Sequence, residues 1–294
     1  MSLKILMLGP SGVGKTSLLA AMRETFQRNA VGLVLRPLND TSVNLDVKWT
    51  ELFNVEQGEV FEEARAGAVQ TTEPEIYEFE LKAEGQTSGE RLEIVDIRGG
   101  MVNKQDVMLN DLIDSSTVIF HVVDSAAMME LQDQKARKHN EVGNVVNLLK
   151  QRTTGTPLLI VTILTKCEKY LRHKQEADLR ACFSSQFDGL LKFVNSKGTF
   201  SHKLVAVETL GCVHFSRIVR ENDSDRLVFI KKGGELKPSR LETPLQLAIQ
   251  HAFQEYSHRK SFPRKVLDWM TRKAHDEARA LKKFSEDMNS KDLL

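Results

Sequence analysis

The sequence predicts an α/β fold in three layers, a mostly parallel sheet with helices on both faces. Three almost unbroken apolar runs support this prediction, at residues 3–8, 118–123 and 158–164. Runs of this kind are typical of strands that are covered on both faces. Helical patterns separate the runs along the chain, and such alternation places the strands in one parallel or mixed sheet. Ligands of such a sheet bind at the carboxyl ends of its strands.

The elements can be assigned in order from their patterns. Apolar runs and apolar–polar alternation predict strands at residues 3–8, 76–81, 92–97, 118–123, 158–164 and 203–208. Residues 31–39 read as an extended connection. Helical patterns lie at residues 16–22, 41–67, 128–151, 179–193 and 244–256, and Gly58 divides the second of them.

We expect residues 1–258 to form one domain, with the helical pattern at about residues 41–67 as an insertion. The segment 259–294 is expected to be a C-terminal amphipathic helix, because its apolar side chains recur at gaps of three and four. This helix could dock on the chain's own core, drive self-association or meet a partner.

Composition narrows the functional classes. The 294 residues carry 28% charged side chains and a formal net charge of +1, which suits one large or two small globular domains. The balance of charge gives no reason to expect nucleic acid or a membrane surface as a partner. No apolar stretch is long enough for a transmembrane segment. The cysteines Cys167, Cys182 and Cys212 lack metal-ligand spacing, so we expect reduced thiols in a cytoplasmic protein.

The motif that carries the clearest chemistry is Gly9–Thr16, which reads GPSGVGKT and matches G-x-x-x-x-G-K-T. Its glycines let consecutive backbone N–H groups wrap a polyphosphate. Lys15 adds a positive charge for the β- and γ-phosphates, and Thr16 offers a hydroxyl to Mg²⁺. A strand precedes the loop and a helix follows it, so the positive end of the helix faces the phosphates.

Two further motifs follow apolar runs. Asp96–Gly99 reads D-x-x-G, in which the Asp can hold Mg²⁺ through a water and the Gly lets a backbone N–H approach the γ-phosphate. Residues 165–168 read T-K-C-E. The carboxylate of Glu168 can accept two hydrogen bonds that guanine offers and adenine does not, while the stem of Lys166 packs on the ring. The alternatives are an ordinary turn at Asp96 and a helix-capping role for Thr165.

In this order and on these elements, the three motifs resemble those of the Ras-like and translation-factor-like P-loop GTPases. Residues 208–211, Glu-Thr-Leu-Gly, are similar to the final base-contacting loop of that family. Residues 233–245 resemble the end of a mostly bacterial subgroup called double-GTPase-like. The resemblance covers residues 3–256 and implies a three-layer P-loop NTPase G domain that binds GTP or GDP with Mg²⁺.

The resemblance also implies a role for each matching residue. Lys15, Thr72 and Gly99 would act in catalysis, Thr72 being the switch threonine, with Thr71 as the alternative. Mg²⁺ would be held by Thr16, Thr72 and Asp96. The nucleotide would contact Gly9, Pro10, Ser11, Gly12, Val13, Gly14, Lys15, Thr16, Ser17, Thr165, Lys166, Glu168, Thr209 and Leu210.

Three positions depart from the family pattern. Glu168 stands where Asp is usual, and Thr165 where Asn is usual, so the side-chain amide that tethers this segment to the phosphate loop is lost. Gly100 stands where Gln orients the attacking water, which predicts slow hydrolysis, on the order of 10⁻⁴ per second without a partner. Arg98 is either a cis arginine for catalysis or a solvated switch residue.

These features predict a GTP-binding switch, in which segments near Thr72 and residues 96–104 change order with the γ-phosphate, and which has a protein effector or regulator. One alternative is a guanylate-kinase-like nucleoside monophosphate kinase, because GPSGVGK also resembles the loop of those enzymes. Another is a nucleotide-binding interaction module with negligible hydrolysis.

Overall fold

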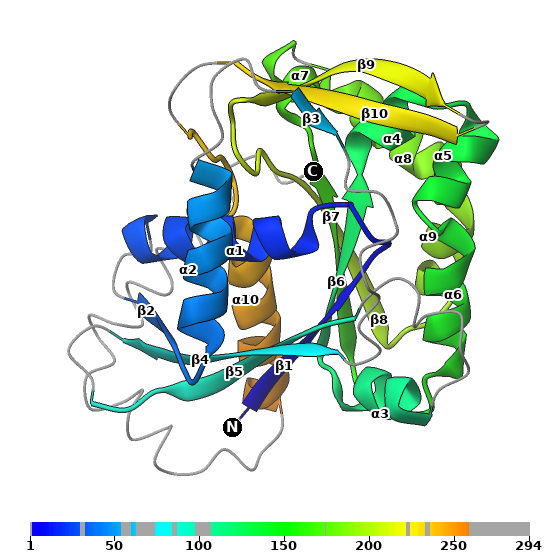
Figure 1. Cartoon of the computed structure of the whole chain (residues 1–294). Coiled ribbons are helices and arrows are strands. Elements are labelled where there is room, and N and C mark those ends of the chain that lie inside the picture. Colours follow the sequence, from blue (N-terminus) through cyan, green and yellow to red (C-terminus); the bar gives the residue numbers. More distant parts are fainter. Residues whose placement is uncertain are drawn as a thin grey trace.

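The computed structural model describes residues 2–29, 33–53, 60–62, 74–83, 87–97, 107–173, 175–221, 224–232 and 236–258. These residues contain a seven-stranded sheet with helices on both faces (Figure 1). Its strands are β1 (Ser2–Leu8), β2 (Leu33–Pro37), β4 (Glu75–Ala83), β5 (Glu90–Asp96), β6 (Val118–Asp124), β7 (Leu158–Thr165) and β8 (Phe200–Ala206). The predicted α/β class is confirmed.

The order across the sheet is β2-β4-β5-β1-β6-β7-β8. The five strands from β5 to β8 are parallel to their neighbours, while β4 is antiparallel to both β5 and β2. The sheet is therefore mostly parallel, as predicted. β1 lies between β5 and β6, so the loop that leaves its carboxyl end is flanked by the ends of both neighbours.

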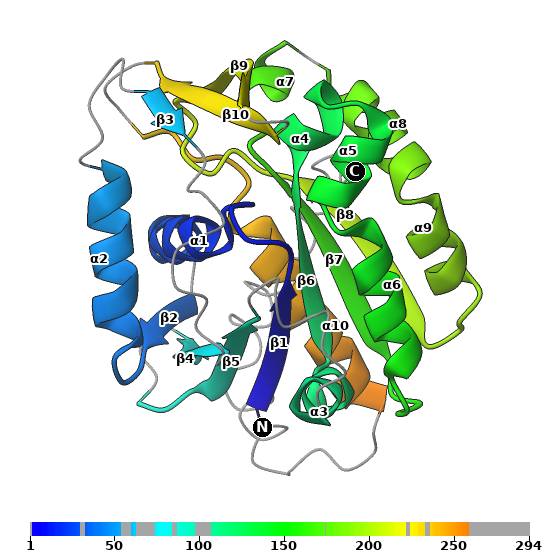
Figure 2. The same cartoon turned by 45° about the vertical axis from the view of Figure 1, so that its right-hand side comes forward.

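The two faces of β1 show why its apolar run is continuous. Leu3, Ile5 and Met7 pack into the core on one face, and Leu6 and Leu8 pack into the core on the other. The first core is covered by α1 (Lys15–Asn29), α2 (Thr41–Phe53) and α10 (Thr243–His258). The second is covered by α3 (Val107–Ser115), α6 (Val142–Gln151), α8 (Glu176–Gln186) and α9 (Asp188–Asn195) (Figure 2).

Two predicted helices are divided in the structure. The pattern of residues 128–151 forms α4 (Ser125–Glu130), α5 (Asp133–His139) and α6, and that of residues 179–193 forms α8 and α9. Leu131 and Gln132 have extended ψ values of 156° and 144°, which end α4 before α5 starts. Glu141 has a left-handed φ of 46°, which separates α5 from α6.

The prediction of helix throughout residues 41–67 was wrong at residues 60–62. The helix ends with α2 at Phe53, and Val60–Glu62 form the strand β3, while residues 54–59 and 63–67 lie outside the described residues. β3 pairs antiparallel with β10 (Ser224–Lys231), with Phe61 opposite Phe229. β-branched and aromatic residues such as Val60 and Phe61 favour strand pairing once a partner strand is available.

The sequence did not predict a second sheet. It has the order β3-β10-β9, where β9 is Val213–Glu221, and we call it the small sheet. Leu227 and Phe229 of β10 pack on Ala126 and Ala127 of α4, the helix that follows β6. The small sheet therefore lies beside the carboxyl ends of the central strands, where the site is expected (Figure 1).

Several predictions fall on residues outside the described ones. Thr71 and Thr72, the segment 98–100 and the amphipathic helix of residues 259–294 belong to this group. The division of the chain at residue 258 also stays a prediction. No helix in the described part of the chain combines the length and the apolar character that crossing a bilayer requires.

Candidate nucleotide-binding site

The predicted phosphate loop joins β1 to α1 and needs its glycines for two different reasons. Gly12 and Gly14 have φ values of 85° and 92°, in the region that favours glycine. A Cβ there would meet no atom within 4 Å, so the backbone conformation is the constraint. At Gly9 a Cβ would lie 2.6 Å from the carbonyl oxygen of Val122, so this glycine allows the loop to pack against β6.

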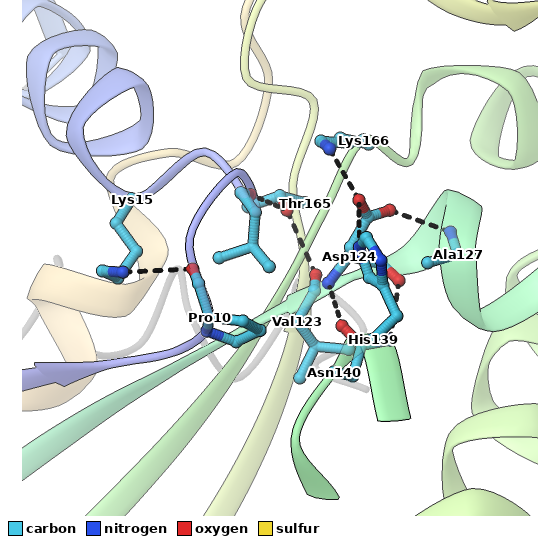
Figure 3. Close-up of polar contacts among 10 residues, drawn as sticks. Pro10, Lys15, Val123, Asp124, Ala127, His139, Asn140, Thr165 and Lys166 are labelled. Carbon is cyan, nitrogen blue, oxygen red and sulfur yellow. Dashed lines mark hydrogen bonds and ion pairs between the residues drawn. The ribbon is translucent and has the colours of Figure 1, made fainter. Parts of the chain in front are cut away.

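Lys15 is folded back over the phosphate loop. Its Nζ donates to the carbonyl oxygens of Gly9 at 2.8 Å and Pro10 at 3.2 Å, the latter shown in Figure 3. The same nitrogen lies 3.7 Å from Oδ1 of Asp96, and Lys15 is 8% exposed. The ammonium thus lies between the loop and the end of β5, where a polyphosphate in the loop could exchange these contacts for its own oxygens.

Asp96 reaches this position because β1 and β5 are parallel neighbours, with Met7 opposite Asp96. The N–H of Ile97 donates to the carbonyl of Met7 at 3.1 Å and extends this pairing past the end of β5. Asp96 is buried, and Thr16 stands in the first turn of α1. Two of the three predicted Mg²⁺ ligands therefore lie on neighbouring elements, and the third, Thr72, is outside the described residues.

The donor types fit a magnesium ion that is shared with phosphates. Mg²⁺ binds oxygen ligands and usually takes one or two protein groups, waters and substrate phosphates. Thr16 and Asp96 offer a hydroxyl and a carboxylate of this kind. Within the described ranges, no three His, Cys, Asp or Glu side chains gather into a separate metal cluster.

Thr165 adds a contact that the sequence did not predict. With Thr in place of Asn, the sequence predicted the loss of the side-chain amide that tethers the T-K-C-E segment to the phosphate loop. In the structure the Thr165 hydroxyl donates to the carbonyl of Val13 in the phosphate loop, at 2.8 Å, and also lies 3.1 Å from the carbonyl of Val123 (Figure 3). Thr165 is 1% exposed. The hydroxyl therefore provides the tether without an amide.

Glu168 and the predicted final base-contacting loop come together. Glu168 begins α7 (Glu168–Arg172), is 4% exposed and accepts a hydrogen bond from the backbone N–H of Leu210 at 3.2 Å. Burial raises the pKa of the Glu168 carboxyl to about 7, although backbone N–H groups, including that of Leu210, act in the opposite direction. The carboxylate and the loop thus form one unit at the ends of β7 and β8.

The loop with Thr209 and Leu210 is held on its other side as well. The carbonyl of Leu210 accepts from the N–H of Lys237 at 2.9 Å, and Glu208 forms an antiparallel bridge with Ser239. The guanidinium of Arg172, in α7, donates to the carbonyl of Gly211. These backbone contacts fix the position of the predicted base-contacting loop.

Lys166 contacts a residue that the sequence analysis did not predict to belong to the site. Its Nζ lies 2.6 Å from Oδ2 of Asp124, a fully buried residue at the end of β6. Figure 3 shows Lys166 and Lys15 on opposite sides of Thr165, so the two predicted lysines serve different parts of the site. An acidic residue at the end of an apolar run, in Val122-Val123-Asp124-Ser125, was the available signal.

Comparisons with known proteins give likenesses to solved structures alone. No family model matches the sequence, and no curated protein matches it. Similar structures include the bacterial dynamin GTPase LeoA from ETEC, at 17% identity and a TM-score of 0.38, covering 70% of this chain and 30% of that one. The S. cerevisiae Ski7 GTPase-like domain bound to GTP has 15% identity and a TM-score of 0.37, covering 70% of this chain and 43% of its own.

A third similar structure is the signal recognition particle receptor SRb-GTP/SRX complex from Chaetomium thermophilum. It has 16% identity and a TM-score of 0.39, and the match covers 71% of this chain and 91% of that chain. The matches to LeoA and to the Ski7 chain cover 30% and 43% of those chains, so the present chain spans less than half of the length of either.

Proposed function

We propose that this chain binds guanine nucleotides with Mg²⁺ and hydrolyses GTP slowly, as a switch protein. The observation that carries the proposal is the Thr165 hydroxyl bonded to the Val13 carbonyl at 2.8 Å. It joins a loop with phosphate-binding chemistry to a segment that presents a buried carboxylate, Glu168. One ligand with a polyphosphate at one end and a hydrogen-bonding base at the other suits both parts.

At the phosphate end, Lys15 and the N–H groups of the loop would carry the negative charge. Lys15 Nζ already lies 2.8 and 3.2 Å from two loop carbonyls, so its ammonium is directed into the curve of the loop. The first turn of α1 adds its partial positive charge. Thr16 and Asp96 would hold Mg²⁺, which supplies charge neutralisation to the β- and γ-phosphates.

At the base end, Glu168 provides the selectivity for guanine. Its carboxylate, when ionised, can accept hydrogen bonds from the N1–H and the exocyclic amine of guanine, and adenine has no matching pair of donors. The Leu210 N–H that Glu168 now binds at 3.2 Å would be released or shared when the base enters. Glu168, which is one methylene longer than the usual Asp, is buried at the start of α7.

Slow hydrolysis follows from the residue after Gly99. Gly100 has no side chain to orient the attacking water, whereas the Ras-like and translation-factor-like GTPases that the sequence resembles have Gln at this position. The described residues would supply phosphate and base contacts, and water positioning would depend on the segment 98–100 or on a protein partner. That partner, self-association through residues 259–294 and a cytoplasmic location stay predictions from the sequence.

The test is a binding and turnover assay with GTP, with ATP, and with GTP plus GMP. We expect GDP and GTP to bind at least tenfold more tightly than ATP, and GTP to give GDP and phosphate slowly. Equal affinity for ATP and GTP would contradict the role of Glu168. Conversion of GMP to GDP would show the kinase alternative instead.

A pair of lysine variants tests the phosphate end. Lys15→Met keeps the aliphatic stem and removes the charge, and we expect the GDP affinity to fall by about a hundredfold, because charge-assisted hydrogen bonds to phosphate are lost. Lys192→Met is the control, since Lys192 pairs with Asp188 on the exposed surface of α9. Unchanged GDP affinity in Lys15→Met would overturn the assignment of the phosphate loop.

A further inference from the structure

The Lys166 side chain is held from two sides by groups outside the motifs. Oδ2 of Asp124 lies 2.6 Å from its Nζ, and the ring centroid of Phe229, in the small sheet, lies 4.9 Å from the same atom. The Lys166 side chain is 18% exposed, so most of it is covered. We call Asp124, Phe229 and Lys166 the lysine clamp.

The backbone sets up this clamp. In the parallel pair of β6 and β7, Asp124 stands opposite Thr165, the residue before Lys166. Lys166 has a φ of 56°, in the left-handed region, and this turn at the end of β7 accompanies a side chain directed toward β6. A lysine in an extended continuation of β7 would instead alternate faces with its neighbours.

Asp124 is itself immobilised. Its Oδ1 accepts from the N–H of Ala127 at 2.9 Å, at the start of α4. The side chain of Asn140 bonds both the N–H of Asp124, at 2.9 Å, and its carbonyl, at 3.2 Å. Burial raises the pKa of the Asp124 carboxyl, but the charge of Lys166, together with His139 at 3.4 Å, outweighs it and leaves the pKa below its usual range. The carboxylate is therefore ionised and fixed.

Phe229 connects the clamp to the small sheet. Its ring packs with Ala126 and Ala127 of α4 and lies 6.1 Å from the ring of Phe215 in β9. A cation near an aromatic face is stabilised by the ring quadrupole. The ammonium of Lys166 thus has an anion on one side and an aromatic face nearby, and both are carried by elements that do not bind phosphate.

We propose that Asp124 and Phe229 position Lys166 so that its aliphatic stem forms a fixed platform for the guanine base, and that the small sheet thereby takes part in base recognition. This inference rests on the proposed function. A free lysine side chain has many rotamers, and ordering one on binding costs affinity. The clamp orders the stem before the base arrives and keeps the ammonium away from the phosphate loop, which Lys15 serves.

The test separates the two ends of the nucleotide by using two probes, GDP and inorganic tripolyphosphate, each with Mg²⁺. Asp124→Asn keeps an acceptor for the Ala127 N–H and removes the charge that holds Lys166. We expect GDP affinity to fall about tenfold and tripolyphosphate affinity to stay within about twofold, because the phosphate loop is untouched. Phe229→Leu should lower GDP affinity about threefold, with the same insensitivity to tripolyphosphate.

The matched control is Glu130→Gln. Glu130 holds Lys169 at 2.6 Å, the same separation as in the Asp124–Lys166 pair, but Lys169 is not in the base-binding set. This variant should bind both probes normally. Thermal unfolding of each variant shows whether it is folded. If Asp124→Asn does not fold, Phe229→Leu, which keeps the Asp124–Lys166 ion pair, still tests the inference.

A mutant cycle distinguishes positioning from general damage. Lys166→Met keeps a long stem without a charge, so Asp124 has nothing left to position. Asp124→Asn in the Lys166→Met background should therefore cause no additional loss of GDP affinity. Equal losses for GDP and tripolyphosphate, unchanged GDP affinity, or additive effects in the cycle would overturn the inference. If the unaltered protein did not bind GDP, the proposed function would fail, and the inference with it.

Discussion

Replacing Thr165 by valine removes one hydroxyl from the link between the two ends of the site and keeps nearly the same volume. The residue is 1% exposed, and its hydroxyl lies 2.8 Å from the Val13 carbonyl and 3.1 Å from the Val123 carbonyl. Valine would leave both carbonyls without this donor. A buried polar group that loses its partner costs about 1–3 kcal/mol, so we expect the free energy of unfolding to fall by that amount.

The same substitution should also weaken nucleotide binding. The hydroxyl holds the phosphate loop against the T-K-C-E segment before any ligand arrives. Without it, the ligand has to order the two segments, and if about 1.4 kcal/mol of the loss appears in binding, the dissociation constant for GDP rises about tenfold. Titration calorimetry with GDP measures the affinity, and urea unfolding without nucleotide measures the stability.

Thr162→Val is the matched control on the same strand. Thr162 is fully buried, and its hydroxyl lies 3.2 Å from Nδ1 of His121 and 2.9 Å from Nε2 of His202, away from the phosphate loop. It should lower stability by a similar amount and leave GDP affinity unchanged. If Thr165→Val loses stability as the control does but binds GDP normally, the Thr165 hydroxyl is structural and our reading of the tether is refuted.

The central strands could be predicted because consecutive residues in the sequence show that both of their faces are buried. β1, β6 and β7 are covered by helices on both faces, which requires the continuous apolar runs that identify them. Strand β4 showed the alternation expected of a strand with one covered face, with Tyr77 and Phe79 buried and Ile76 51% exposed. In each case neighbouring residues in the chain carried the signal.

The small sheet could not be predicted in this way. The pairing of β9 with β10 shifts between Val228 and Phe229, and a bulge of this kind breaks the period-two pattern that identifies a strand. β3 has three residues, too few to show any period. Its partner β10 stands more than 160 residues later in the chain, so the pairing depends on tertiary contacts.

In the candidate site, too, the residues of local patterns could be predicted and those that depend on tertiary contacts could not. The phosphate loop is a local pattern of spacing, so its residues could be named from the sequence. The roles of Asp124 and of the Thr165 hydroxyl depend on the register between β6 and β7, which sets Asp124 opposite Thr165. Register is a property of two segments that lie about 40 residues apart, and no local pattern reports it.

Two pH experiments test the buried titratable groups. Burial raises the pKa of Glu168 to about 7, so its ionised fraction is about one tenth at pH 6 and nine tenths at pH 8. GDP affinity should therefore be about tenfold weaker at pH 6 than at pH 8, and Glu168→Gln should abolish that difference. A pH response that persists unchanged in Glu168→Gln would contradict the role of Glu168 in base binding. Burial also lowers the pKa of His121 to about 3 and that of His202 to about 4, with the neighbouring positive charge of Lys203 adding to the effect at His202. Both imidazoles are therefore neutral in the folded protein at pH 5, whereas in the unfolded chain both titrate near about 6.5 and are charged at that pH. At these two positions the unfolded state then binds about two more protons, so the two histidines lower the free energy of unfolding by about 2.7 kcal/mol for each pH unit lost around pH 5, partly offset by Glu168, whose raised pKa keeps it protonated in the folded protein. Urea unfolding from pH 7 to 4.5 measures the slope, and His121→Phe should reduce it by about 1.4 kcal/mol per pH unit, because one of the two imidazoles is gone. A slope that His121→Phe does not change would show that other groups control acid stability.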